Sequence, residues 1–388
     1  MANLVEWPKA MKRIRRTVEA FTAAGSTAHV VIDGRPLVSF CGNDYLGLAR
    51  DPRVAAALAG ASSTCGAGAG ASHLISGHGR EHALLEAELA EFTARERALL
   101  FSTGYMANLA AVSTLAGRGD LVLLDRLSHA SLIDAALLSR ARLRRYAHAS
   151  AAAAAAMLGA PRGSGGALLV TDGVFSMDGD LAPVRELSAL AHAHAATLVV
   201  DDAHGLGVIG ATGRGTLEQL ELDARAVPLL VGTLGKAFGT FGAFIAGSAE
   251  LIESLIQRAR TYIYTTALPQ PVAAATRAAL KLAQEEGWRR AHVLALTARF
   301  REAARARGIA LTDSGTPIQP IILGSAEAAL EASERLLASG MWVAAIRPPT
   351  VPEGASRLRI TFSAAHREEE VTALVAALDR ILPSGARA

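Results

Sequence analysis

A lysine directly after an apolar run could supply a reactive amine. Residues 227–231 are Val-Pro-Leu-Leu-Val, which predicts a buried strand, and Lys236 follows between Gly235 and Gly239. Lysine is rare in this chain and arginine is abundant. An amine can lose its proton and attack an aldehyde, which a guanidinium cannot, so Lys236 is a candidate for Schiff-base chemistry. An exposed lysine in a Gly-rich turn would have the same local sequence.

A carboxylate and two imidazoles also lie at or just after the ends of predicted strands. Asp201 ends the apolar run 197–200 and precedes His204, while His129 follows another apolar run and opens a predicted helix. A carboxylate at the end of a buried strand is unfavourable unless it contacts a positive group, and a protonated pyridine nitrogen is such a group. A helix cap or a core ion pair would explain Asp201 equally well by itself.

A phosphate site is predicted where residues 98–101 form a short strand. Gly104 and Tyr105 follow it at the expected start of a helix, and free N–H groups at a helix start bind phosphate. A lysine for an imine, an aspartate for a ring nitrogen, a stacking ring at His129 and a phosphate cradle are together what pyridoxal phosphate requires.

Short apolar strands alternate with helices over most of the first 270 residues. This alternation predicts an α/β fold in which helices cover both faces of a mostly parallel sheet. Ligands bind at the carboxyl ends of such strands. The residues expected on that rim are Gly104, His129, Ser176, Asp201, His204, Thr233 and Lys236.

The pattern changes on both sides of this region. Residues 5–24 predict a helix, and residues 30–40 predict a hairpin around Asp33-Gly34. Residues 64–80 are rich in glycine, alanine and serine and predict a long loop. Long helices and shorter strands near the C-terminus predict a small α+β unit. We therefore expect an N-terminal segment over 1–40, a large cofactor-binding domain over 41–270 and a small C-terminal domain over 271–388.

Composition narrows the class of protein. The 388 residues are 51% hydrophobic, enough for a sizeable core. No apolar run approaches the ~18 uncharged residues of a membrane span, and no secretory signal is visible at the N-terminus. Cys41 and Cys65 have no metal spacing and predict no disulfide framework. The net charge of +3 comes from scattered arginines, so no nucleic-acid partner is expected. These observations predict a soluble cytoplasmic protein.

Three motifs look like binding sites but lack the required context. Residues 205–210 match GxGxxG, yet they do not directly follow the strand and no helix is predicted after them. Residues 232–236 are too short for a P-loop. His78 and His82 are four apart and could share a metal, but no carboxylate or cysteine completes the set. No metal site is therefore expected, and His73 and His78 receive no role.

Seven stretches of the chain resemble the α-oxoamine synthases, which are pyridoxal-phosphate enzymes of the aspartate-aminotransferase fold. They are SFCGNDYLGL, FSTGYMAN, DRLSHASL, TDGVFSMDGD, VVDDAHGLGVIG, GTLGKAFG and IRPPTVPEGASRLRITFSAAH. The resemblance covers about residues 10–382. It implies a fold-type I PLP-dependent transferase that condenses an amino acid with an acyl thioester, and a homodimer with its sites at the subunit interface.

The resemblance also implies roles at the cofactor. Lys236 would hold the cofactor and move the substrate α-proton, and Asp201 would pair with the pyridine nitrogen. His204 would bond the ring hydroxyl oxygen, and His129 would stack on the ring and border the substrate. The residues implied around the ring edge and the phosphate are Gly104, Tyr105, Ser176 and Thr233, with Thr265 or Thr266 reaching the phosphate of a partner subunit.

On the substrate side, the resemblance implies that Arg347 holds the amino-acid carboxylate. Asn43 and Thr350 would line the same side. An arginine of the predicted N-terminal helix, Arg15 or else Arg16, would contact the acyl substrate. The catalytic set implied is thus Lys236, His129, Asp201 and His204.

The stretch AIRPPTVP at 345–352 is most similar to the family member that joins L-alanine to a pimeloyl thioester in biotin biosynthesis. Whether coenzyme A or an acyl-carrier protein delivers the acyl group is not indicated. A sister enzyme that joins glycine to a short acyl-CoA and an ordinary aminotransferase are the alternatives. A DNA-binding regulator of this fold would need an added helix-turn-helix domain, which the pattern does not predict.

Overall fold

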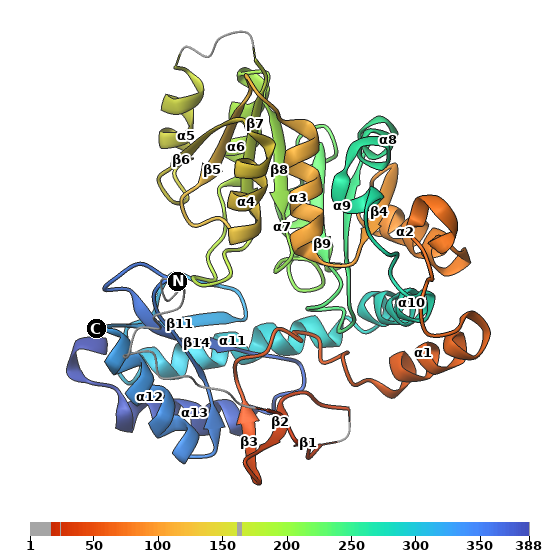
Figure 1. Cartoon of the computed structure of the whole chain (residues 1–388). Helices are drawn as coiled ribbons and strands as arrows, with labels where there is room; N and C mark the ends of the chain where they lie inside the picture. Colours follow the sequence, from red (N-terminus) through yellow and green to blue (C-terminus); the bar gives the residue numbers. More distant parts are fainter. Residues whose placement is uncertain (1–16, 24, 161–164, 388) are drawn as a thin grey trace, which may run out of the picture.

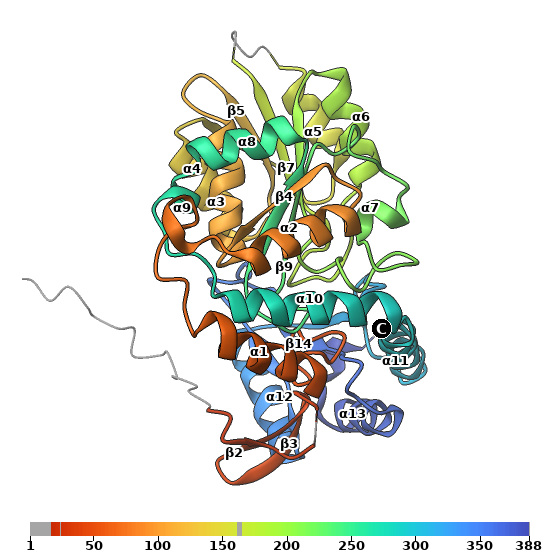
Figure 2. The same ribbon diagram turned by 90° about the vertical axis from the view of Figure 1, so that its right-hand side faces the viewer.

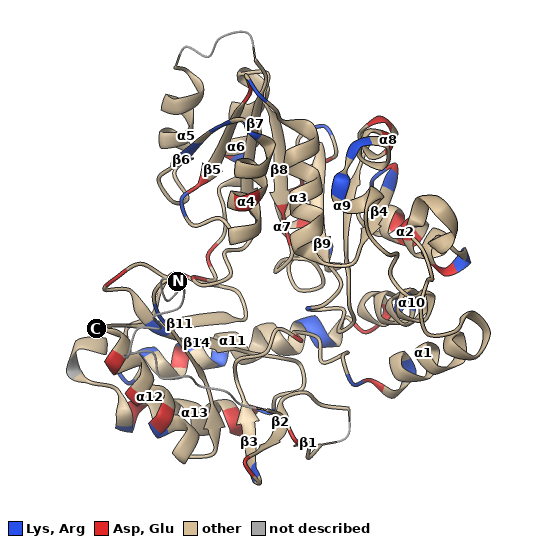
Figure 3. Ribbon diagram, in the orientation of Figure 1, with Lys and Arg blue, Asp and Glu red and all other residues tan. Residues whose placement is uncertain are grey.

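The computed structural model describes residues 17–23, 25–160 and 165–387. A seven-stranded sheet occupies one half of the molecule, and two smaller sheets with the C-terminal helices occupy the other (Figure 1). Residues of opposite charge are mixed along the ribbon (Figure 3). None of the helices in the described ranges is both long and apolar enough to cross a membrane.

The large sheet has the strand order β4-β10-β9-β8-β7-β5-β6. Its strands are β4 (Arg97–Phe101), β5 (Leu121–Asp125), β6 (Arg142–Tyr146), β7 (Ala167–Asp172), β8 (Thr197–Asp201), β9 (Leu229–Thr233) and β10 (Ala243–Gly247). The pairings among β5 to β9 are parallel, whereas β10 runs antiparallel to both β4 and β9. The predicted α/β class with a mostly parallel sheet is confirmed.

Alternate residues of the central strands enter two different cores. In β5, Leu121 and Leu123 pack in one cluster, and Val122 and Leu124 pack in the other. The helices of the first face are α5 (Ala151–Leu158), α6 (Val184–Ala193) and α7 (Thr216–Gln219). Those of the second face are α3 (Gly104–Leu115), α4 (Ala130–Ser139), α8 (Ala249–Arg258) and α9 (Arg260–Ile263). Helices on both faces explain why these strands read as continuous apolar runs.

A third and larger core joins the two halves of the molecule. It contains Phe244 of β10 together with residues of helices that lie outside the large sheet, such as Phe300 and Leu378. These helices are α1 (Pro52–Cys65), α2 (Arg80–Phe92), α10 (Gln270–Glu285), α11 (Trp288–Arg305), α12 (Ala326–Ala338) and α13 (Glu368–Ile381). Figure 2 shows α10 crossing the molecule between the large sheet and α1. The division at residues 40 and 270 stays a prediction.

The two small sheets bring distant parts of the chain together. One has the order β11-β14-β13, and the other has the order β1-β2-β3-β12. Their strands are β11 (Ile318–Gly324), β13 (Ala344–Ile346), β14 (Ser356–Thr361), β1 (Ala20–Phe21), β2 (His29–Ile32), β3 (Arg35–Ser39) and β12 (Met341–Trp342). The predicted hairpin is β2–β3, and Asp33 and Gly34 have the positive φ angles, 52° and 69°, of its two-residue turn. In the same sheet, Val38 pairs in parallel with Met341.

Two local predictions are wrong in the part of the chain that the structure covers. The helix predicted over 5–24 falls mostly outside the described residues, but Ala20–Phe21 form strand β1, because the open edge of β2 offers backbone partners. The loop predicted over 64–80 contains a π-helical turn, η1 (His73–Gly77), in which the N–H of Gly77 bonds to the carbonyl oxygen of Ser72 at 2.9 Å. Periodicity cannot reveal a single turn of this kind.

Candidate active site

Lys236 follows β9 and contacts a histidine that follows the neighbouring strand β8. Lys236 Nζ lies 2.8 Å from His204 Nε2, and His204 Nδ1 lies 2.8 Å from the Tyr45 hydroxyl. The Tyr45 hydroxyl donates in turn to Asn43 Oδ1 at 3.3 Å. A row of polar contacts therefore runs from the lysine across the carboxyl edge of the sheet to the loop at residues 41–47.

One assignment of protons satisfies every member of this row. The Lys236 ammonium donates to His204 Nε2, so His204 carries its proton on Nδ1 and donates it to the Tyr45 oxygen. Burial, followed by the charge of Lys236, lowers the pKa of His204 well below 6.5, which keeps the ring neutral. Burial also lowers the pKa of Lys236, to about 8, although Asp201 opposes the shift. A lysine with this pKa can release a proton near neutral pH.

Asp201 is buried at the last position of β8 and accepts two hydrogen bonds. Asn108 Nδ2 lies 2.6 Å from Asp201 Oδ2, and the N–H of Ala203 donates to Oδ1 at 3.0 Å. Asn108 Nδ2 also donates to Ser131 Oγ at 2.9 Å, and Ser131 Oγ lies 2.7 Å from His129 Nδ1. One network from α3 and α4 thus orients both the Asp201 carboxylate and the His129 ring.

A second buried carboxylate lies beside Asp201. Asp172 ends β7, pairs with Asp201 in the strand register, and accepts the N–H of His129 at 3.1 Å. Burial, followed by the charge of Asp201, raises the pKa of Asp172 well above 3.8. Two carboxylates at this depth are stable only when one is protonated or when a cation lies close to them. This edge of the sheet therefore suits a protonated ring nitrogen.

The start of α3 presents unpaired donors. Thr103 caps the helix, and its hydroxyl oxygen accepts the N–H of Met106 at 3.2 Å. Within the described ranges, no oxygen accepts the N–H of Gly104 or of Tyr105. Free N–H groups at a helix N-terminus bind phosphate. Tyr105 is exposed, and its hydroxyl donates to Asp134.

Two further predicted residues lie on the rim. Thr233 ends β9, and its hydroxyl donates to the carbonyl oxygen of Gly242 at 3.2 Å. The carbonyl oxygen of Ser176 accepts Arg359 Nε at 2.6 Å, and Arg359 Nη2 donates to Asn43 Oδ1 at 3.2 Å. Arg359 thus connects strand β14 to both sides of the site.

The remaining predicted residues belong to other segments of the chain. Arg347 and Thr350 lie on the loop after β13, where the Thr350 N–H donates to the Arg347 carbonyl oxygen at 3.0 Å. Residues 265–266 lie between α9 and α10. Arg15 and its alternative Arg16 fall outside the described residues.

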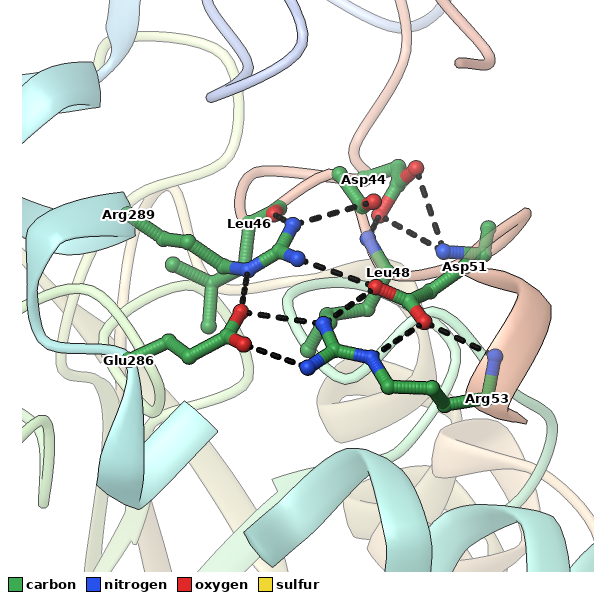
Figure 4. Close-up of polar contacts among 9 residues, drawn as sticks. Asp44, Leu46, Leu48, Asp51, Arg53, Glu286 and Arg289 are labelled. Carbon is green, nitrogen blue, oxygen red and sulfur yellow. Dashed lines mark hydrogen bonds and ion pairs between the residues drawn. The ribbon is translucent and has the colours of Figure 1, made fainter. Parts of the chain in front are cut away.

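Ion pairs to helix α11 hold the chain that leads away from Tyr45. Arg289 donates to the Leu46 carbonyl oxygen at 2.9 Å and to Asp51 Oδ2 at 3.0 Å. Arg53 pairs with both Asp51 and Glu286, and Glu286 also pairs with Arg289 (Figure 4). The loop that carries Tyr45 is therefore fixed to the C-terminal half of the molecule.

Sequence reasoning missed four residues of the site: Tyr45, Asn108, Asp172 and Arg359. Asp172 could have been found, because it ends an apolar run just as Asp201 does. Asn108 lies one helical turn after Gly104, a spacing that places both on one side of α3. Tyr45 and Arg359 had no such signal, since their contacts cross between distant parts of the chain.

Comparison with known proteins agrees with this geometry. Residues 35–378 match the family described as aminotransferase class I and II. The chain is 59% identical to the 8-amino-7-oxononanoate synthase of Thioalkalivibrio sulfidiphilus, over 96% of this chain and 94% of that protein. It is 58% identical to the 8-amino-7-oxononanoate synthase of Methylococcus capsulatus, over 96% and 95% of the two chains.

Solved structures give the same picture. A serine palmitoyltransferase from S. paucimobilis, solved with bound PLP, superimposes with a TM-score of 0.91 at 31% identity, covering 95% of this chain and 92% of that one. The 8-amino-7-oxononanoate synthase from Francisella tularensis superimposes with a TM-score of 0.78 at 30% identity, covering 89% and 97%.

Proposed function

Because this chain belongs to the aminotransferase class I and II family and, within it, to the 8-amino-7-oxononanoate synthases, we propose that it condenses L-alanine with a pimeloyl thioester. The products are 8-amino-7-oxononanoate, carbon dioxide and a free thiol, in biotin biosynthesis. The observation that carries this proposal is the buried contact of Lys236 with neutral His204, where burial lowers the pKa of Lys236 to about 8.

The residues at the carboxyl edge fit pyridoxal phosphate, the cofactor of this family. When bound, the cofactor supplies an aldehyde and a pyridinium ring that accepts electrons. Asp201 would hold the ring nitrogen, His129 would stack on the ring and His204 would bond the ring hydroxyl oxygen. The free N–H groups of Gly104 and Tyr105 would receive the phosphate. The residues proposed to complete the cofactor contacts are Ser176, Thr233 and, from a partner subunit, Thr265 or Thr266.

Lys236 would act as the base once its amine is free of the cofactor. Nζ takes the α-proton of alanine and later returns a proton to the product. A pKa of about 8 leaves a usable fraction of neutral amine near neutral pH, whereas an ordinary lysine would stay protonated. His204 Nε2 accepts a hydrogen bond from the ammonium form and so orients Nζ during both transfers.

Substrate binding would use the loop after β13 and the loop before α1. We propose that Arg347 binds the alanine carboxylate and that Thr350 and Asn43 border the same space. Arg359 fixes the Asn43 amide, which supports this position. Arg15 remains our proposal for the contact with the acyl chain.

The working form is proposed to be a cytoplasmic homodimer. Ile75 of η1 and Tyr264, next to α9, expose 81% and 70% of their surface, and contact between η1 and α9 makes this face a candidate subunit interface. Neither Cys41 nor Cys65 forms a disulfide within the described residues, which agrees with a reducing compartment.

Thiol release by the cofactor-loaded protein tests the function. L-Alanine with pimeloyl-CoA, or with the pimeloyl carrier-protein ester, should release one thiol for each 8-amino-7-oxononanoate detected by mass. Glycine with acetyl-CoA and L-serine with palmitoyl-CoA are the matched substrate pairs. Preference for either of these pairs would overturn the substrate assignment, and keto acid formed from alanine without thiol release would indicate an aminotransferase.

A further inference from the structure

Three histidines that the proposed reaction does not use meet where η1, α2 and α9 come together. The ring centroids of His73 and His78 are 5.2 Å apart, those of His73 and His82 are 5.1 Å apart, and those of His78 and His82 are 5.4 Å apart. One ring nitrogen from each residue lies within 4.8 Å of the other two. The three rings therefore form a triangle around one small region.

The second nitrogen of two of these rings already faces an oxygen. His82 Nε2 contacts the carbonyl oxygen of Leu268, and His78 Nε2 lies 3.9 Å from Glu86 Oε2. Histidines that bind metals keep their proton on the nitrogen away from the metal and donate it to a carbonyl or carboxylate oxygen. Nδ1 is the other nitrogen of both rings; it accepts the Gly79 N–H in His82 and lies 3.0 Å from His73 Nδ1 in His78.

We propose that His73, His78 and His82 form a site for a divalent transition-metal ion such as Zn²⁺, each through Nδ1. Imidazole is a good ligand for zinc, cobalt, nickel and copper, and three protein nitrogens with one water make a common tetrahedral set. Tetrahedral bonds of ~2.0–2.1 Å place the nitrogens ~3.3 Å apart. The His73–His78 pair is already near that spacing, and ring nitrogens that lie within 4.8 Å of one another need to close by at most ~1.5 Å.

Binding requires two local changes, and neither removes a proton from the protein. The proton that His73 and His78 share between their Nδ1 atoms must move to Nε2 of the ring that carries it. In His78, the resulting Nε2–H can donate to Glu86. The N–H of Gly79, which donates to His82 Nδ1 at 3.0 Å, loses this acceptor. Gly79 is half-buried, so water can take the place of His82.

The fold supplies a third histidine ligand and a carboxylate that the sequence did not reveal. Helical spacing predicted only His78 and His82 as neighbours, without a third ligand. The π-helical turn η1 brings His73 to the same place, and Glu86 provides a carboxylate behind His78.

A metal here would stiffen the elements behind the phosphate end of the site without touching Lys236. The His73 ring stacks on Tyr262 of α9, with centroids 5.0 Å apart and an interplanar angle of 12°. Thr261, also in α9, donates to the carbonyl oxygen of Met106 in the first turn of α3 at 2.9 Å. The proposed metal is thus structural.

Titration of the tag-free, cofactor-loaded protein with Co²⁺ tests the site. We expect one equivalent per chain with the visible absorption of tetrahedral cobalt, and displacement by Zn²⁺. His73→Gln and His78→Gln should each abolish this stoichiometric binding. Glu86→Gln should weaken it ~10–100-fold, the usual effect of losing a carboxylate behind a histidine ligand. His192→Gln, on the exposed side of α6, is the matched control and should bind as the parent protein does.

Binding that is non-stoichiometric, or that is equal in the parent, His73→Gln and His78→Gln, would overturn the proposal. The three rings would then be a hydrogen-bonded structural cluster only. Because His78 is more exposed than His73, His78→Gln keeps the experiment decisive even where His73→Gln fails to fold.

Discussion

Two histidines at the carboxyl edge of the large sheet have opposite electrostatic surroundings. His204 contacts the Lys236 ammonium, and burial together with this charge holds its pKa well below 6.5. His148 lies between Asp125 and Asp180, at 3.0 Å and 2.8 Å. Burial lowers the pKa of His148 too, but the two carboxylates outweigh it and raise the pKa to about 10.

Since burial acts in the same direction on both rings, the partners decide the charge. His148 is a fixed cation that neutralises two acids and holds β5, β6 and the chain after β7 together. His204 is a neutral hydrogen-bond acceptor for Lys236, and it can keep this contact while Lys236 gains and loses a proton. The same side chain therefore contributes stability at one end of the edge and supports proton chemistry at the other.

The largest effect is expected at the His204 end. Lys236→Ala should lower kcat by at least ~10²–10⁴-fold, because it removes the amine that moves the α-proton. Thiol release with alanine and pimeloyl-CoA measures this. Lys281→Ala, an exposed lysine paired with Glu285, is the control and should keep full activity. Substantial turnover by Lys236→Ala would mean that the contact between Lys236 and His204 is not needed for catalysis.

At the other end, His148→Gln should lower the free energy of unfolding by about 3 kcal/mol at pH 6, because it leaves two carboxylates without their cation. The folded pKa of about 10 exceeds the ordinary 6.5, so this stabilisation is complete below pH 6.5 and fades as the pH rises towards 10. Urea unfolding at pH 6 and pH 10 should show the gap to the parent shrinking. A gap that is equal at both pH values would mean that His148 is not charged.

Tyr45→Phe tests whether the neutral His204 needs a fixed tautomer. Burial raises the pKa of Tyr45 to about 12, so its hydroxyl stays protonated and can accept from His204 Nδ1. Its loss should lower kcat about tenfold, the effect of one hydrogen bond of about 1.4 kcal/mol. The kcat–pH profile should also move to lower pH, because a weaker acceptor at Nε2 favours the Lys236 ammonium less. Lower stability with an unchanged pH profile would leave Tyr45 a structural role only.

The smallest effect is expected where an ion pair faces solvent. Arg53 is half exposed, so Arg53→Ala should lower the free energy of unfolding by only about 0.5 kcal/mol, and less at high salt. Thermal unfolding at low and high salt measures this. A loss above about 2 kcal/mol would place the network of Figure 4 beside the His148 pair in strength, and would weaken the contrast between buried and exposed partners.

Much of the fold could be read from local patterns. Apolar runs such as 197–200 predicted strands because both faces of this sheet are buried. Asp201, His204 and Lys236 were found because ligands bind at the carboxyl ends of such strands. The α/β class followed from the alternation alone.

What could not be predicted depends on contacts across the chain. Tyr45 reaches His204 only because ion pairs fix its loop to α11, and no spacing in the sequence encodes that. The antiparallel direction of β10 is invisible to periodicity, which is the same for both directions. The end of the predicted N-terminal helix is a strand because β2 offers it an edge, so tertiary pairing overrode local preference.

The parallel pairing of β3 with β12 has a consequence for biosynthesis. Val38 leaves the ribosome about 300 residues ahead of its partner Met341. Until Met341 emerges, the outer edge of the β2–β3 hairpin has no native neighbour, and an open strand edge invites pairing with another nascent chain. Slow translation or crowded polysomes should therefore promote mispairing of this protein at the β2–β3 hairpin.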